Sequence, residues 1–451
     1  MKFSKLLGAV LTGTMLVTTV GCGSDNSSSS GGDEIYFLNF KPEISQVYER
    51  IAKDYEAETG VRVKVETAAS GTYETTLKSE ISKSFPPTIY QINGPVGYES
   101  WKNYTADLKD TQLYELLTDK SLAVTDGEGV YGIPYVVEGY GIIYNDKIMR
   151  DYFALPNKKV SISSADEITN FETLKAVVED MTDNLEALGI SGVFASTSLG
   201  SGEQWRWQTH LANTPFYHEF LDYDGVENPI LAGLEMDEIE FTYNENFRNL
   251  FDLYINNSVT KPGLLGSKSV TDSMAEFALG RVAMVQNGSW AWAQIDEVGG
   301  NIVKADDIKF MPLYMGIEGE ENYGLSIGTE NYFSINSQAS QEQQDMAVDF
   351  LEWLFTSEIG KYYVLNELNL VAPFASFDET ERPSDPLAKE IIRWLEKDVE
   401  SVPWAFITFP SEHFKNRVGD ALLTYAQGQT EWNEVVAVTV DAWKTEVSLK
   451  K

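Results

Sequence analysis

Residues 34–92 alternate between strand and helix patterns, and this alternation limits the possible folds more than any other feature. The segments that we predict are a buried strand over 34–39, an amphipathic helix over 43–59, an alternating strand over 61–65, a helix over 72–82 and a strand over 88–92. Two successive strand–helix–strand connections predict a parallel sheet with right-handed crossovers. Ligands of open α/β sheets lie beyond the carboxyl ends of the strands, so the residues that follow each strand become candidates for a site.

A second α/β region is predicted to begin near Gly139. Its expected elements are a helix opened by a capping box at Thr169–Glu172, a helix over 272–279 before the strand 281–285, and a helix over 343–358 with Gly360 at its end. The C-terminal third is expected to be rich in helices. About 420 residues with 43% hydrophobic composition are enough for two or more domains.

The first 33 residues have the composition of an export signal and a tether. Lys2 and Lys5 precede the apolar run 6–20, which is short for a membrane span. Cys22, the only cysteine, follows this run and resembles the acylated cysteine of a bacterial lipoprotein. An ordinary cleaved signal with an incidental cysteine is the alternative. Residues 22–33 contain no apolar residue to bury beyond Cys22 and predict a flexible tether.

The charge of the chain excludes some partners. The formal net charge is −35, and removal of a leader that carries two lysines gives −37 for the mature chain. Nucleic acid and anionic lipid both require a basic surface, so neither is an expected partner. A mature body without cysteine has no thiol for catalysis or for zinc binding.

Catalytic signatures are absent from the sequence. The chain has three histidines, of which His210 and His218 are eight residues apart without an HExxH motif, so we expect no metal site and place these histidines at the surface or in a cleft. There is no GxxxxGKS or GxxxxGKT phosphate loop and no CxxC pair. We therefore expect a binding protein without a cofactor. The alternative is a surface glycoside hydrolase that uses Glu138 and Glu203.

Three motifs contain aromatic and polar side chains close together. In the first, 131–145, Glu138 interrupts an apolar run beside Tyr140, and it either faces a ligand cleft or points to water from the end of a strand. In the second, 202–210, Trp205 and Trp207 lie near an arginine and a histidine. One of these two tryptophans is expected in the core, and the sequence leaves open which one.

The third motif, 284–296, follows a predicted strand. We expect Asn287, Gly288 and Ser289 to form a turn that opens a helix, with Trp290 at the carboxyl end of the strand. Aromatic faces in such positions can stack on sugar rings, while acids and amides bind hydroxyl groups. Trp292, two residues later, is expected in the core.

With these motifs, the chain resembles the family 1 extracellular solute-binding proteins of ABC importers, which include maltose- and oligosaccharide-binding proteins. Asn287–Trp292 is similar to the family's NGPWAW-type turn, 133–145 to its first interdomain crossover, and 203–205 to its Glu-x-aromatic element. Asn39 and Lys41 stand where the family has polar contacts. The family's Trp and Asp after the third strand are replaced here around Asn93, which leaves the identity of the sugar open.

The resemblance implies a type II periplasmic-binding-protein-like α/β fold with two lobes, 34–138 plus 328–371 and 139–327 plus 372–451, joined by crossovers near 138–140, 326–329 and 371–374. It implies a monomeric lipoprotein on the outer face of the cytoplasmic membrane that delivers a mono- or oligosaccharide to the importer's permease subunits. A peptide or polyol ligand is the alternative. The ligand-binding residues that we predict are Asn39, Lys41, Asn93, Tyr135, Glu138, Tyr140, Glu203, Trp205, Trp207, Asn287, Trp290 and Tyr323.

Overall fold

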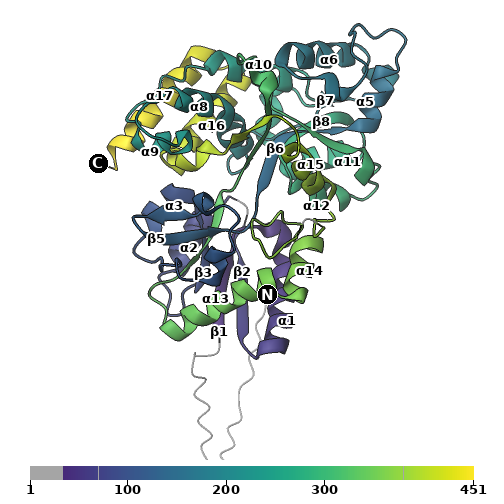
Figure 1. The fold of residues 1–451 in the computed structure, drawn as a ribbon. Coiled ribbons are helices and arrows are strands. Elements are labelled where there is room, and N and C mark those ends of the chain that lie inside the picture. The colour runs from purple at the N-terminus through teal and green to yellow at the C-terminus, as the bar shows by residue number, and fades with distance from the viewer. Residues whose placement is uncertain (1–33, 70, 379, 451) are drawn as a thin grey trace, which may run out of the picture. The chain divides into compact units, whose positions relative to one another are not determined.

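The computed structural model describes residues 34–69, 71–378 and 380–450. The predicted signal peptide (1–21), Cys22 and the tether to residue 33 lie outside this range. The described part contains two six-stranded sheets (Figure 1). None of its helices is long and apolar enough to cross a membrane.

The first sheet has the strand order β2-β1-β3-β11-β5-β4. Its strands are β1 (Glu34–Asn39), β2 (Arg62–Thr67), β3 (Ile89–Asn93), β4 (Val124–Asp126), β5 (Gly129–Pro134) and β11 (Asn331–Ile335). Strand β1 pairs in parallel with β2 and β3, which confirms the parallel arrangement predicted for residues 34–92. Strand β11 returns from much later in the chain and pairs antiparallel with β3 and β5.

Alternation along β1 gives the first sheet two apolar faces. Ile35 and Phe37 belong to one buried cluster, and Tyr36 and Leu38 belong to another. Helices α1 (Ser45–Thr59), α4 (Gln112–Glu115), α13 (Gln341–Thr356) and α14 (Glu358–Asn366) contribute to the first cluster, and α2 (Tyr73–Glu80) and α3 (Gly94–Trp101) contribute to the second. Burial on both faces is the usual state of a sheet with parallel strands.

The second sheet has the order β12-β10-β6-β8-β7, and β9 pairs with the far end of β6. Its strands are β6 (Glu138–Asn145), β7 (Gly192–Phe194), β8 (Val282–Gly288), β9 (Ile308–Met311), β10 (Tyr323–Gly328) and β12 (Glu400–Pro403). Every residue of the central strands β6 and β8 is buried.

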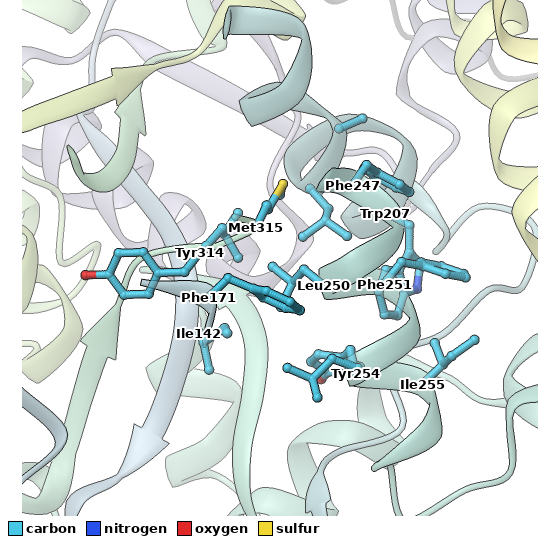
Figure 2. Close-up of a cluster of buried hydrophobic side chains, with 14 of the residues drawn as sticks. Ile142, Phe171, Trp207, Phe247, Leu250, Phe251, Tyr254, Ile255, Tyr314 and Met315 are labelled. Atoms are coloured by element: carbon cyan, nitrogen blue, oxygen red, sulfur yellow. The ribbon is translucent and has the colours of Figure 1, made fainter. Parts of the chain in front are cut away.

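Helices surround the second sheet with two large clusters of buried side chains. These helices are α5 (Asp146–Phe153), α6 (Phe171–Asp183), α7 (Leu185–Leu188), α8 (Ala212–Leu221), α9 (Ala232–Glu235), α10 (Asn244–Asn256), α11 (Val270–Ala278), α12 (Ala291–Asp296), α15 (Pro386–Leu395), α16 (Glu412–Ala426) and α17 (Trp432–Ser448). Figure 2 shows part of the larger cluster, where Trp207 lies beside Phe251 and Tyr254.

The chain passes between the two sheets three times. The first two connections, β5 to β6 and β10 to β11, are only a few residues long. The third follows α14, and we predicted it near 371–374. Val371 bridges Val137, and Phe374 is buried in the core of the first sheet and bridges Leu117. The residues from 372 to at least 374 thus pack with the first sheet, because an apolar side chain there completes its core.

Three local predictions are wrong. Helix α6 is capped by Asn170, whose side chain accepts a hydrogen bond from the Thr173 N–H at 2.9 Å, so the expected capping box at Thr169 does not form. Helix α13 ends at Thr356, and Ser357 caps a new helix that contains Gly360. Asn287 and Gly288 belong to β8 because they pair with β6, so the strand continues through the expected turn.

Candidate functional site

Three neighbouring strands of the second sheet, β10, β6 and β8, form the floor of the candidate site. Gly328 at the end of β10 pairs with Glu138, and Gly288 at the end of β8 pairs with Tyr140. Each glycine lies directly under an indole. A Cβ atom on Gly288 would lie 2.1 Å from the ring of Trp290, and one on Gly328 would lie 2.5 Å from Trp404. Both close approaches therefore require glycine.

His210 lies among five other rings, and we call the six together the aromatic group: Tyr140, Trp205, His210, Trp290, Trp404 and Phe406. Its ring centre is 4.5 Å from that of Tyr140, 4.7 Å from Phe406, 5.1 Å from Trp205, 5.2 Å from Trp404 and 5.6 Å from Trp290. Trp205 and Trp290 are partly exposed, whereas His210 is buried. Most of these rings come from the strand ends and from a π-helical segment, η4 (Arg206–Leu211). Such segments are frequent at functional sites.

Lys41 brings a positive charge from the first sheet to the aromatic group. Asn39 shapes the loop after β1, since its side chain accepts a hydrogen bond from the Lys41 N–H and donates one to the Lys41 carbonyl. The Lys41 ammonium lies 2.6 Å from Glu138 Oε1 and 5.3 Å from the centre of the Trp290 ring. Both charged side chains are buried, so this ion pair ties the loop after β1 to the start of β6.

Arg206 is a second buried cation of the site. Its guanidinium carbon lies 4.0 Å from the centre of the Trp205 ring, and Nε donates to Asn287 Oδ1 at 3.4 Å. No carboxylate of the described residues forms an ion pair with it. Burial lowers the pKa of Arg206, but a guanidinium remains charged at pH 7.

Burial also determines the charge of two acid–base groups. It lowers the pKa of His210 well below the ordinary value, with Arg206 as a further cause, so the ring is neutral at pH 7. Burial and, after it, the negative charge of Glu138 raise the pKa of Glu330 to about 7, although Lys41 opposes the shift. The site therefore has one carboxyl group that is partly protonated at neutral pH.

Several buried polar atoms near the aromatic group have no hydrogen-bond partner within the described protein. They include Trp404 Nε1, Thr329 Oγ1, Asn331 Oδ1 and Gln286 Nε2. Buried polar groups are normally paired, so a concentration of unpaired ones indicates a place for water or a ligand. In the described ranges, no group of three His, Cys, Asp or Glu side chains could hold a metal ion.

The structure brings some of the predicted residues together and separates others. Tyr140, Trp205 and Trp290 belong to the aromatic group, and Lys41 lies over the ring of Trp290. Asn39 and Glu138 contact Lys41, and Asn287 contacts Arg206, so all seven belong to the site. Trp207 does not, because it is fully buried against Phe251 and Tyr254 (Figure 2). Glu203 accepts a hydrogen bond from the Val270 N–H at the start of α11 instead of facing the rings.

For three more predicted residues, the contacts in the described structure are with other residues than the aromatic group. Tyr135 is buried in the core of the first sheet, where it accepts a hydrogen bond from Gln91. Asn93 ends β3 and pairs with Asn331 in the neighbouring strand. Tyr323 begins β10, at the opposite end from Gly328, and packs on His218.

The sequence reasoning missed Trp404, Phe406, His210 and Glu330. Trp404 directly follows β12, so the rule that selected Trp290 would have found it if this short strand had been recognised. The role of Glu330 depends on pairing between strands that are far apart in the sequence.

Comparison with known proteins now identifies the family. A family model for the bacterial extracellular solute-binding proteins matches residues 50–390, which is more than half of the chain. The chain belongs to this family. This confirms the predicted resemblance, and it places the chain among solute-binding proteins instead of enzymes.

Two curated relatives match part of this solute-binding protein. A maltooligosaccharide ABC transporter solute-binding lipoprotein of Streptococcus pneumoniae is 30% identical over 159 residues, which are 34% of this chain and 37% of that protein. A diacetylchitobiose binding protein, DasA, of Streptomyces coelicolor is 29% identical over 164 residues, 33% of this chain and 38% of that protein. The match thus spans less than two fifths of the length of these relatives.

Solved structures support the fold. A chitin oligosaccharide binding protein has a TM-score of 0.70 at 16% identity and covers 93% of this chain and 100% of its own. Apo RafE from Streptococcus pneumoniae has a TM-score of 0.64 at 18% identity, with coverage of 92% and 98%. These similarities confirm the type II periplasmic-binding-protein-like fold.

Proposed function

We propose that this chain is the lipid-anchored solute-binding protein of an ABC importer and that it binds a mono- or oligosaccharide between its two α/β lobes. Membership of the extracellular solute-binding family supports the transport role. The relatives named for maltooligosaccharide and diacetylchitobiose binding favour a sugar. In this proposal Cys22 carries the lipid, the protein acts as a monomer, and the closed form docks on the permease subunits.

The aromatic group is the observation that carries the sugar assignment. Partly exposed indoles offer flat apolar faces for the C–H side of a sugar ring. Beside them, Lys41, Glu138 and Arg206 supply charged hydrogen-bonding groups, and Trp404 has an unpaired N–H. A polyhydroxylated ligand can satisfy donors and acceptors at once, which a purely apolar ligand cannot do.

The two-lobe organisation would allow the ligand to control closure. Lys41 belongs to the first lobe and the aromatic group to the second, so a ligand that contacts both would favour the closed form by its differential affinity. An affinity near 1 μM corresponds to about −8 kcal/mol, which a few stacked rings and a hydroxyl network can supply.

Calorimetry with purified protein tests the proposal. The probes are maltotriose, diacetylchitobiose and raffinose, with sorbitol and a dipeptide as non-sugar ligands. We expect saturable binding of at least one oligosaccharide, and we expect Trp290→Ala to weaken it by about 30-fold or more, the loss of roughly 2 kcal/mol that defines a dominant contact.

Trp292→Ala is the matched control. Trp292 is two residues from Trp290, is partly buried in another cluster and forms no ring contact with the aromatic group. We expect its loss to change the affinity less than about threefold. Binding of sorbitol or the dipeptide in place of every oligosaccharide would contradict the sugar assignment, and an unaffected Trp290→Ala variant would contradict the site.

A further inference from the structure

Four glutamates come from the segments that bring side chains to the aromatic group, and three of them bind a cation or a helix start. Glu138 binds the Lys41 ammonium at 2.6 Å, and Glu43 lies 4.0 Å from the same ammonium. Glu203 accepts the Val270 N–H. Each of these three carboxylates therefore already has a role within the protein, as the partner of a buried cation or of a helix start.

Among the described residues, the hydrogen-bond partner of Glu330 is a neutral side chain. Glu330 lies between β10 and β11, in the second connection between the sheets. One oxygen accepts a hydrogen bond from its neighbour Asn331 at 3.3 Å, and the other is 3.9 Å from His210 Nε2, beyond hydrogen-bond range. Its side chain is 21% exposed, compared with 5% for Glu138, so it is the more accessible acid.

The surroundings of Glu330 contain unpaired donors and acceptors. Thr329 Oγ1 and Asn331 Oδ1, on either side of it in the chain, are buried and have no partner among the described residues. Across Gly328, the buried Trp404 Nε1–H is also unpaired. Unpaired polar atoms in the segments next to a partly exposed carboxyl group are the kind of groups that a hydroxyl-rich molecule can satisfy.

We propose that Glu330 is a ligand-binding residue whose carboxylate accepts a hydrogen bond from a hydroxyl group of the solute, so that binding releases a proton from this side chain. This inference rests on the proposed function and names an acceptor that the family motifs in this sequence do not include. The proton leaves the Glu330 carboxyl group for the buffer, and no bond of the solute changes.

The charges around Glu330 support this coupling. Its pKa is raised to about 7, first by burial and then by Glu138, while Lys41 and Lys415 oppose the shift and Glu412 adds to it slightly. His210 faces the same carboxyl group but is neutral. In the free protein, the Glu330 carboxyl group is therefore protonated in about half of the molecules at pH 7. A donating hydroxyl stabilises the ionised form and lowers the pKa in the complex.

The sign of the pH dependence follows. The ionised carboxylate is the stronger acceptor of this hydrogen bond, so the affinity is highest above pH 8 and falls as the pH drops below 7. A pKa of about 7 that moves well below 6 in the complex predicts an affinity about tenfold weaker at pH 6 than at pH 8, with about half a proton released per ligand at pH 7.

Calorimetry at pH 7 in phosphate and in Tris measures this release, because the two buffers take up a proton with different enthalpies. The probes are maltotriose, diacetylchitobiose and raffinose, and titrations at pH 6 and pH 8 give the change in affinity. We expect Glu330→Gln to abolish both the proton release and the tenfold dependence. Asp385→Asn is the matched control, since the pKa of Asp385 is also raised, to about 6, but it caps α15 and Asn can replace it there.

The outcomes separate this inference from the proposed function. Oligosaccharide binding with the same enthalpy in both buffers would overturn the role of Glu330 and leave the proposed function intact. Proton release that persists in Glu330→Gln, or that disappears in Asp385→Asn, would also overturn the role of Glu330 and leave the proposed function intact. Failure of every oligosaccharide to bind would refute the proposed function, and this inference with it.

Discussion

The buried ion pair between Lys41 and Glu138 gives the sharpest test of how the site is held together. Its two side chains are 7% and 5% exposed, and the charged atoms are 2.6 Å apart. Replacing Lys41 with methionine keeps most of the side-chain volume but leaves the carboxylate of Glu138 buried without its cation. Loss of one partner of a buried pair typically costs 3–5 kcal/mol, whereas loss of both is often nearly neutral.

The part of the cost that comes from the Glu138 carboxylate has an upper bound in the Lys41→Met variant, because a carboxylate without its cation can take up a proton. For an ordinary glutamate with a pKa of about 4.3, protonation at pH 7 costs 1.36 kcal/mol for each of 2.7 pH units, or about 3.7 kcal/mol. At pH 5.5 the same reasoning gives about 1.6 kcal/mol. The penalty must therefore shrink as the pH falls.

A double-mutant cycle measures the prediction. Urea unfolding of the wild type, Lys41→Met, Glu138→Gln and the double variant at pH 7 and 5.5 gives the four free energies of unfolding. We expect Glu138→Gln to cost less than Lys41→Met, because Glu43 still lies 4.0 Å from the ammonium. The double variant should recover at least 2 kcal/mol relative to the sum of the single changes. A Lys41→Met penalty that is equal at both pH values would refute the reasoning.

The other predictions concern tryptophans of the second lobe. Trp207→Ala should lower the free energy of unfolding by about 3–5 kcal/mol, because it empties a fully buried position. Trp205→Ala should lower it by less than half as much, because Trp205 is partly exposed. Urea unfolding measures both, and equal losses would contradict the placement of Trp207 in the core and Trp205 at the site. Gly288→Ala should displace the ring of Trp290 and weaken oligosaccharide binding in calorimetry by about tenfold or more, whereas the control Gly299→Ala, with no atom within 4 Å of the added carbon, should bind normally.

Much of the fold could be predicted from periodicity. The apolar stripe of α1 and the alternation of β2 are local patterns, and they indicated a parallel sheet that the structure contains. Element ends were less predictable, because they depend on partners elsewhere. Asn287 and Gly288 have the composition of a turn, yet strand β6 offers them hydrogen bonds, and pairing overrides the local preference.

The candidate site was only partly predictable, for a similar reason. The two tryptophans at 205 and 207 are equivalent in sequence, and only the packing of Phe251 and Tyr254 decides that Trp207 belongs to the core. Glu203 has the composition of a ligand-binding acid, but the start of α11 needs an acceptor for its first N–H groups and uses this carboxylate.

The two glycines under the indoles explain why the site forms at this end of the second sheet. Trp290 and Trp404 come from separate segments, after β8 and after β12, but each lies on a glycine of a strand that borders β6. Any larger residue at 288 or 328 would occupy the space of the ring above it. Because β6 starts with Glu138 between these two strands, the same pairing also positions the carboxylate that holds Lys41 over Trp290. The spacing of aromatic and charged groups is therefore fixed by strand register, and a change of register in β10 or β8 would separate them even if every side chain were kept.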